Sequence, residues 1–363
     1  MKKDWTYKKL GELTKIKTGK LDANASSADG IYPFFTCSRE PLRISSYSYD
    51  CECVLVAGNG ELNVKYYNGK FDAYQRTYII EALPDSGIMT YYMYHFFNQY
   101  VETLRQKSIG GIIKYIKLGD LTDAVIPIPP LSIQRSIVAE LDLLHSVISK
   151  KKEQLRELDN LAQSLFYQMF GDPITNPMGW EIKKLGEVGD IVGGSTPKTS
   201  DEKNWIGINQ WVSPAELKGD KYFGKTVHTI SDEAASKLQL LPKGTVLLSS
   251  RAPIGKLAIT TQPMYCNQGF KNIVCGPSIN NEFVYGYLQL NIPRLQSLGV
   301  GATFKEISKK MVESFPIILP PLSLQQSFAA KVSAIEVQKQ AITQSIHHTE
   351  ALLAQRMDNY FGI

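Results

Sequence analysis

The chain has 363 residues, a length that suits two domains of ~150 residues with a connecting part. Its 43% hydrophobic and 21% charged content is that of a globular protein and excludes a globally disordered or collagen-like chain. The 40 Lys and Arg residues against 35 Asp and Glu residues leave a net charge of +5, which is compatible with a polyanionic partner without requiring one.

The cysteines and the hydropathy of the sequence argue against disulfide-rich, zinc-binding and membrane-spanning proteins. The five cysteines contain no C-x-x-C spacing, which favours reduced structural thiols over a disulfide framework or a four-thiolate zinc site. The N-terminus lacks the apolar core of a signal peptide, and nowhere do roughly 18 apolar residues follow one another. We therefore expect no membrane span and a cytoplasmic location.

The first body, residues 1–130, is predicted to be an α+β unit. Short apolar runs at 54–57 and 78–80 are bounded by turn residues, a pattern typical of strands. Near 89–104 the apolar spacing becomes helical. Loops connect these elements without the regular alternation of a βαβ array.

The segment 131–171 is predicted to be one long helix. A proline pair precedes it, Ser132 is its predicted N-cap, and Gly171 followed by Pro173 ends it. Its apolar residues alternate in steps of four and three, with Lys151 as the one polar member of this seam, so the helix requires an apolar partner. The apolar members of the seam are Ile137, Leu141, Leu144, Ile148, Leu155, Leu158, Ala162, Leu165 and Met169.

The remaining half follows the same order of body and helix. A turn-rich linker opens the second body, residues 172–321, which has strand-like runs at 246–248 and 257–259 and helical spacing at 281–295. The segment 322–363 is again predicted to be a long helix, with Ser323 as N-cap and a weaker seam. Two helices of ~40 residues would each span ~60 Å, which indicates a spacer. We expect them to pack on each other as an antiparallel coiled coil.

An internal repeat underlies this order. Trp5 and the run KKLGE at 8–12 recur 175 positions later as Trp180 and KKLGE at 183–187. The run PPLSIQ at 129–134 recurs 191 positions later as PPLSLQ, and so does the Phe-Gly pair at 170–171. The 16 additional residues of the second copy therefore lie inside its body. The protein is predicted to be two copies of one plan, related by a pseudo-twofold axis.

Several catalytic patterns are missing. The run GGSTPKT at 193–199 has Pro197 where a phosphate-binding loop needs glycine, and neither proline pair has the polar and aromatic neighbours of an amino-methyltransferase motif. No acidic-pair-plus-Lys nuclease core stands out, and the five histidines lack metal-ligand spacing. We expect no catalytic residue and no metal site in this chain.

What remains are basic and amide side chains on turns at matching places in the two bodies. Arg and Lys suit phosphates and guanine edges, and Asn and Gln suit adenine, so the pattern indicates a nucleic-acid reader. Each loop alone is more typical of ordinary solvated surface, and their recurrence carries the prediction. The candidate DNA-binding residues are Lys20, Arg39, Asn59, Tyr74, Arg76, Lys114 and Tyr115 in the first body, and Ser195, Thr196, Lys198, Thr199, Arg251, Asn267, Lys271, Thr303 and Lys305 in the second.

These motifs together resemble the DNA-specificity subunit of type I restriction-modification systems. The resemblance is carried by W-x-x-x-x-L-G-E at the start of each half, by PPLS[IL]Q before each long helix, and by FGDP followed by NPMGWE between the halves. GGSTPKT and SSRAPIGKLAI in the second body add to it. The resemblance covers nearly the whole chain.

The resemblance implies a non-catalytic subunit in which each body is a target-recognition domain for one half of a split sequence in double-stranded DNA. The helical arms would be a ruler and a platform for two modification subunits, which carry S-adenosylmethionine. Restriction subunits would add ATP-dependent cleavage, and this chain would bind no cofactor. Two alternatives stay open: a stand-alone DNA modification enzyme with an unrecognised active site, and a two-domain adaptor that binds protein.

Overall fold

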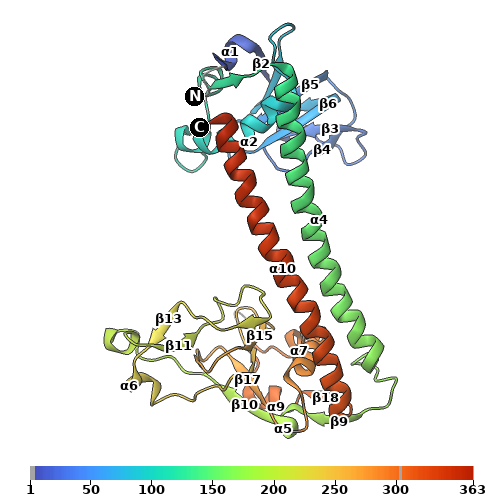
Figure 1. Ribbon diagram of the computed structural model, residues 1–363, viewed down its shortest axis with the longest axis vertical. Helices are drawn as coiled ribbons and strands as arrows, with labels where there is room; N and C mark the ends of the chain where they lie inside the picture. The colour runs from blue at the N-terminus through green and yellow to red at the C-terminus, as the bar shows by residue number, and fades with distance from the viewer. Residues whose placement is uncertain (1–4, 302–304, 363) are drawn as a thin grey trace. The chain divides into compact units, whose positions relative to one another are not determined.

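The computed structural model describes residues 5–301 and 305–362. The chain forms two compact units. The first combines two separate stretches of the chain, and the second is one continuous stretch. Unit 1 comprises Met1–Glu153 together with Thr343–Ile363, and unit 2 is Gln154–Ile342. Figure 1 shows the two units and labels many of their elements as they are named below. No helix in the described part of the chain is long and apolar enough to cross a membrane.

Unit 1 is built on a six-stranded sheet with the strand order β2-β7-β5-β6-β3-β4. Neighbouring strands are antiparallel except β3 and β6, which are parallel. The strands are β2 (Thr14–Thr18), β3 (Tyr32–Phe35), β4 (Leu42–Ile44), β5 (Tyr49–Ala57), β6 (Val64–Ala73) and β7 (Thr77–Ala82), with β1 (Thr6–Lys9) paired to β8 (Val125–Ile128). The helices of the body are α1 (Leu10–Leu13), α2 (Thr90–Lys107) and α3 (Leu118–Thr122).

Successive side chains of strand β5 point to opposite faces of the sheet and pack in two different hydrophobic cores. Val54 and Val56 of β5 pack with Tyr92 and Phe96 of α2 on one face of the sheet. Leu55, with its neighbours on the same face, packs in a second cluster beside the aromatic rings of β3 and β6. Both faces of β5 are therefore buried, which explains why its sequence is apolar at successive positions rather than alternating.

Unit 2 contains a five-stranded sheet of order β10-β17-β14-β15-β12, a three-stranded sheet of order β13-β11-β16, and the pair β18-β9. The strands are β9 (Glu181–Lys184), β10 (Gly189–Gly193), β11 (Asn209–Val212), β12 (Tyr222–Phe223), β13 (His228–Ile230), β14 (Val246–Leu248), β15 (Leu257–Thr260), β16 (Tyr265–Cys266), β17 (Lys271–Cys275) and β18 (Pro316–Leu319). The helices are α5 (Leu185–Val188), α6 (Asp232–Ala235), α7 (Asn281–Leu290), α8 (Ile292–Ser297) and α9 (Lys309–Glu313).

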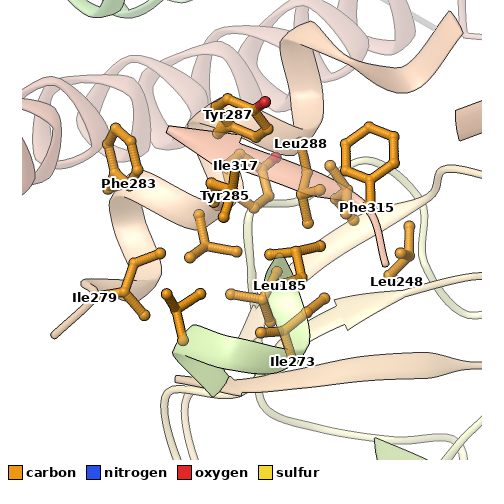
Figure 2. Close-up of a cluster of buried hydrophobic side chains, with 14 of the residues drawn as sticks. Leu185, Leu248, Ile273, Ile279, Phe283, Tyr285, Tyr287, Leu288, Phe315 and Ile317 are labelled. Carbon is orange, nitrogen blue, oxygen red and sulfur yellow. The ribbon is translucent and has the colours of Figure 1, made fainter. Parts of the chain in front are cut away.

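The main core of unit 2 lies between its helices and its five-stranded sheet. In Figure 2, Leu185 of α5 and Ile273 of β17 point toward Phe283 of α7 and Ile317 of β18, and all four are buried. The helix expected at 281–295 is broken into α7 and α8, which corrects that prediction. Pro293 lies in the first turn of α8, where its missing N–H needs no partner, whereas within one continuous helix it would remove a hydrogen bond.

The two predicted arms are α4 (Leu131–Phe170) and α10 (Leu322–Phe361). In unit 1 they run antiparallel, since Glu140 binds Arg356 at 2.8 Å and Lys152, farther along α4, binds Glu350 at 2.8 Å. The predicted fold class is confirmed: two similar α+β units whose long helices pair. The predicted N-caps are wrong, because both helices begin one residue before the serine, with the Pro130 carbonyl accepting from Gln134 N at 3.0 Å.

A buried glutamine joins each arm to its body. In unit 1, Gln134 Oε1 accepts from Met89 N at 2.9 Å, and its Nε2 donates to the carbonyls of Gly87 at 2.7 Å and Pro129 at 2.9 Å. In unit 2, Gln325 makes the corresponding bonds 191 positions later, to Asn280 N at 2.8 Å and to the carbonyls of Ser278 and Pro320 at 3.4 and 2.8 Å. Both side chains are fully buried, so the PPLS[IL]Q motif encodes this joint.

Candidate nucleic-acid interface

Each unit contains a short hairpin held against the loop after a central strand. In unit 1, Ile109 and Tyr115 exchange backbone hydrogen bonds of 3.0 and 2.9 Å, and Ile116 N donates to Gly58 O at 2.9 Å. In unit 2, Val300 and Glu306 exchange bonds of 3.1 and 3.0 Å, and Ile307 N donates to Ser250 O at 3.0 Å. The hairpin residues stand 191 positions apart, so the repeat extends to the details of this site.

Asn59 and Arg251 occupy the same place in the two units. Each forms an isolated β-bridge to its hairpin, Asn59 with Tyr115 and Arg251 with Glu306. The residue before each binds a third loop, because Gly58 N donates to Arg76 O and Ser250 N donates to Gly269 O, both at 2.7 Å. We call these three connected segments the loop junction: residues 58–60, 74–76 and 109–116 in unit 1, and 249–251, 267–270 and 300–301 with 305–307 in unit 2.

Close approach of the loops depends on glycine in unit 1. A Cβ added to Gly58 would lie 2.4 Å from Arg76 O, far inside van der Waals contact. A Cβ on Gly19 would lie 2.0 Å from Ala73 O. Gly19 N donates to Thr77 O at 3.1 Å, which brings the loop that carries Lys20 to the same turn. The side chains of Lys20 and Arg76 are exposed on these adjoining loops.

The last candidate loop of unit 1 carries Arg39. Cys37 of this loop contacts the junction, since its Sγ lies 3.6 Å from Arg76 O, and Asn63 Nδ2 donates to Cys37 O at 2.8 Å. Arg39 Nε donates to Glu61 Oε1 at 2.9 Å, in an ion pair whose side chains are both mostly exposed. Such a pair contributes only ~0–1 kcal/mol, so the guanidinium can exchange its carboxylate for another anion. Lys114 and Tyr115 are also exposed, while Asn59 and Tyr74 are half-buried.

In unit 2 the loop 194–199 joins the junction through side chains. Asn267 Nδ2 donates to Thr196 Oγ1 at 2.8 Å, and Trp211 Nε1 donates to Ser195 O at 3.0 Å. Lys198 and Thr199 are exposed on this loop. Lys305 is exposed on the hairpin, and Thr303 lies outside the described residues.

Two of the predicted contact residues build the junction from inside. Asn267 uses its amide for Thr196 and its Oδ1 to accept from Gly269 N at 2.8 Å. Lys271 is only 14% exposed, and its Nζ lies 3.2 Å from Ser250 Oγ and 3.5 Å from Glu306. The side chains of Asn267 and Lys271 therefore hold neighbouring loops of the junction together. Arg251 is 37% exposed and 4.0 Å from Glu306, so it keeps a solvent-facing side.

The sequence did not single out the acidic partners or the hairpin tip. Glu61 and Glu306 each meet a candidate arginine, a pairing that no local spacing indicates because the partners come from different loops. Ile112 and Ile113 form the exposed tip of the unit 1 hairpin, beside Lys114. A Gly-Gly pair followed by two apolar residues and a lysine was the available signal.

Three of the thiols are poor nucleophiles because burial disfavours their charged form. Burial raises the pKa of Cys53, and raises the pKa of Cys266 and Cys275 to about 12. These thiols therefore stay protonated at neutral pH. Within residues 5–301 and 305–362, no group of three or more His, Cys, Asp or Glu side chains is placed to hold a metal ion.

A comparison with known families identifies the repeated architecture. The family model described as "Type I restriction modification DNA specificity domain" matches residues 2–160 and 177–348, which is most of the chain and both copies of the repeat. The chain belongs to this family. It is a type I DNA specificity protein, and the loop junctions lie inside the two matched regions.

Relatives and solved structures agree with this assignment. The EcoDI specificity subunit from Escherichia coli is 27% identical over 382 aligned positions, covering 96% of this chain and 85% of the relative. The MjaIX specificity subunit from Methanocaldococcus jannaschii is 33% identical, over 43% of this chain and 38% of the relative. These alignments confirm the resemblance seen in the sequence motifs.

Two solved structures share the fold. The specificity subunit from M. genitalium superposes with a TM-score of 0.63 at 14% identity, covering 99% of this chain and 96% of that one. A chain from a structural study of complex assembly and conformational transition in the type I system gives 0.62 at 20% identity, covering 98% and 97%.

Proposed function

We propose that this specificity protein recognises a split DNA sequence, with one half-site read by each loop junction. The observation that carries the proposal is the recurrence of the junction: the same hairpin, the same strand-end loop and the same third loop are bonded together in both units. Because this arrangement of loops recurs in two bodies that otherwise differ, it supports the same role for both units. Two similar readers would contact two separate segments of one duplex.

The side chains of the junctions suit both kinds of DNA contact. Exposed Lys20, Arg76 and Lys114 can neutralise phosphates, and Arg76 can also bind guanine O6 and N7 as a bidentate donor. Asn59 can pair with adenine in the first half-site. Arg251, at the equivalent position of unit 2, would favour guanine instead, which would make the two half-sites differ.

The arms would organise the larger complex. We propose that α4 and α10 hold the readers at a set separation and form the platform for two modification subunits, with restriction subunits joining them in the cytoplasm. S-adenosylmethionine and ATP would bind to those subunits, while this chain would bind no cofactor and perform no chemistry. Complex assembly in the related system supports a multisubunit setting.

The decisive experiment is methylome sequencing of host cells with and without the gene for this chain. A split methylated sequence should appear only in its presence, and exchanging residues 5–130 for the body of a relative should change one half-site alone. An unchanged methylome would refute the proposal.

Two biochemical assays address the alternatives. Methyl transfer by the purified chain with S-adenosylmethionine would support a stand-alone enzyme. The assembled complex should bind DNA with an affinity that falls steeply with salt, because phosphate contacts release counterions. A complex without salt-dependent DNA affinity would support a protein-binding adaptor.

A further inference from the structure

The unit 1 hairpin presents two apolar side chains at its tip. Ile112 has a relative exposure of 104% and Ile113 of 62%, so Ile112 is uncovered and Ile113 is mostly exposed. Single exposed apolar side chains are ordinary on a protein surface, as Ile31 is, but Ile112 and Ile113 are adjacent and form one apolar patch at a loop tip. Two adjacent exposed isoleucines therefore indicate a contact made outside this chain.

The tip stands on a well-anchored base. Gly60 N donates to Lys114 O at 3.0 Å, and Tyr78 Oη donates to Ile116 O at 3.2 Å, in addition to the bonds that close the hairpin. Ile116 is 3% exposed and fixes the base in the core. Gly110 adopts φ 120°, and a Cβ there would lie 2.6 Å from Ile113 O. The turn thus has a defined shape that only glycine permits readily.

The surroundings of the tip favour a nucleic-acid partner over a protein. Lys114 follows it directly, and Arg76 belongs to the loop bonded to Gly58 at the hairpin base. A stable protein interface buries about 800 Å² on each partner, much more than two isoleucines supply. An exposed apolar pair followed directly by a lysine instead fits the space between two base pairs, where apolar side chains act as wedges.

We propose that Ile112 and Ile113 form a wedge that enters the base stack of the first half-site and separates one base step. The proposal rests on the DNA recognition proposed above. The cations of the junction would hold the backbone on either side while the wedge replaces base stacking by apolar contact. Steps that unstack easily, such as TA and CA, would then be preferred at that position without a hydrogen bond to a base.

The proposal concerns unit 1. The matching tip of the second copy, 191 positions later, has Thr303 and Phe304, which lie outside the described residues.

The test uses the full chain assembled with its modification subunits, and duplexes that carry the target defined by the methylome. The fluorescent base 2-aminopurine replaces, one at a time, each position of the first half-site except the base that is methylated. The wild-type complex should raise the fluorescence at one step, because 2-aminopurine brightens when it loses its stacking partner. The double variant Ile112→Ser, Ile113→Ser should abolish that rise and bind the cognate duplex roughly tenfold more weakly.

The matched control is Ile31→Ser. Ile31 is 73% exposed in the same unit but precedes β3, whereas the loop that carries Arg39 follows that strand. This variant should keep both the fluorescence rise and the affinity. An unaltered thermal midpoint for the double variant will show that the body remains folded, as expected for an exposed tip.

The possible outcomes distinguish failure of the wedge proposal from failure of the proposed DNA recognition. If the wild-type complex has no preference for the cognate duplex, the proposed DNA recognition fails. If it binds the cognate duplex specifically but no position brightens, or if the double variant brightens like wild type, the wedge is refuted. Loss of assembly with the modification subunits in the double variant would also overturn it, since the tip would then be a protein contact.

Discussion

Replacing Gln134 by alanine is the sharpest test of how the arm is joined to the first body. The substitution removes three hydrogen bonds at a fully buried position and leaves Met89 N and the carbonyls of Gly87 and Pro129 without that partner. A buried hydrogen bond contributes ~0.5–1.5 kcal/mol net, so three of them predict a loss of about 2–4 kcal/mol in the free energy of unfolding. Gln325→Ala should have a similar effect in unit 2.

Gln134→Glu adds a pH dependence with a defined sign. The carboxylate keeps the acceptor for Met89 N but places an oxygen against two carbonyls that accept hydrogen bonds from Nε2 of Gln134 in the wild type. Folding should therefore raise the pKa of this carboxyl above its unfolded value, because only the protonated form can donate to a carbonyl. The stability of the glutamate variant, relative to the alanine variant at the same pH, should be greatest below the unfolded pKa and fall as pH rises.

Urea unfolding followed by circular dichroism measures these effects. Gln163→Ala is the control, because Gln163 is exposed on the same helix and should change stability by less than ~0.5 kcal/mol. If Gln134→Ala unfolds within ~0.5 kcal/mol of the wild type, the glutamine does not join arm and body in the way the hydrogen bonds indicate.

The other predictions concern the proposed DNA contacts and the arms. Arg76→Ala should weaken cognate binding by ~1–3 kcal/mol and relax the first half-site alone, and Arg251→Ala the second alone; equal losses on cognate and scrambled duplex in a competition assay would indicate a phosphate contact only. Deleting one heptad from both arms should alter the number of unspecified base pairs between the half-sites, and an unaltered spacing in the methylome of a folded, active variant would rule out the ruler. A fragment of residues 1 to about 175 should dimerise, because Phe170 of a second copy can take the place of Phe361; a folded monomer by light scattering at micromolar concentration would contradict this.

Much of the fold could be predicted because the chain repeats itself. The PPLS[IL]Q runs and the heptad seam located α4 and α10 to within a few residues, since a sustained period is a strong signal. Both arms begin at the predicted residues, but their N-caps were wrong, because a serine just after a proline pair has the composition of an N-cap whether or not it occupies that position. The break between α7 and α8 was missed because the apolar spacing continues across Pro293.

The candidate site was predictable in composition but not in its internal contacts. The sequence indicated which loops carry cations and amides, and the hydrogen bonds of the two junctions connect these loops in space. It could not distinguish Asn267 and Lys271, which bind neighbouring loops, from Arg76, which is exposed. That difference depends on which loops approach each other across the chain, and local residue types carry no information about it.

The discontinuity of unit 1 has a consequence for how the protein is made. Phe361 is 4% exposed and packs at ring-centroid distances of 5.3 Å from Tyr92 and 5.8 Å from Phe96. During translation, the segment Met1–Glu153 leaves the ribosome long before Thr343–Ile363 is synthesised. The aromatic side chains that Phe361 covers therefore stay exposed until then. Unit 2 is one continuous stretch and can close first. Unit 1 is therefore completed after unit 2, and a stop codon shortly before residue 343 would damage the unit whose N-terminal part was synthesised first.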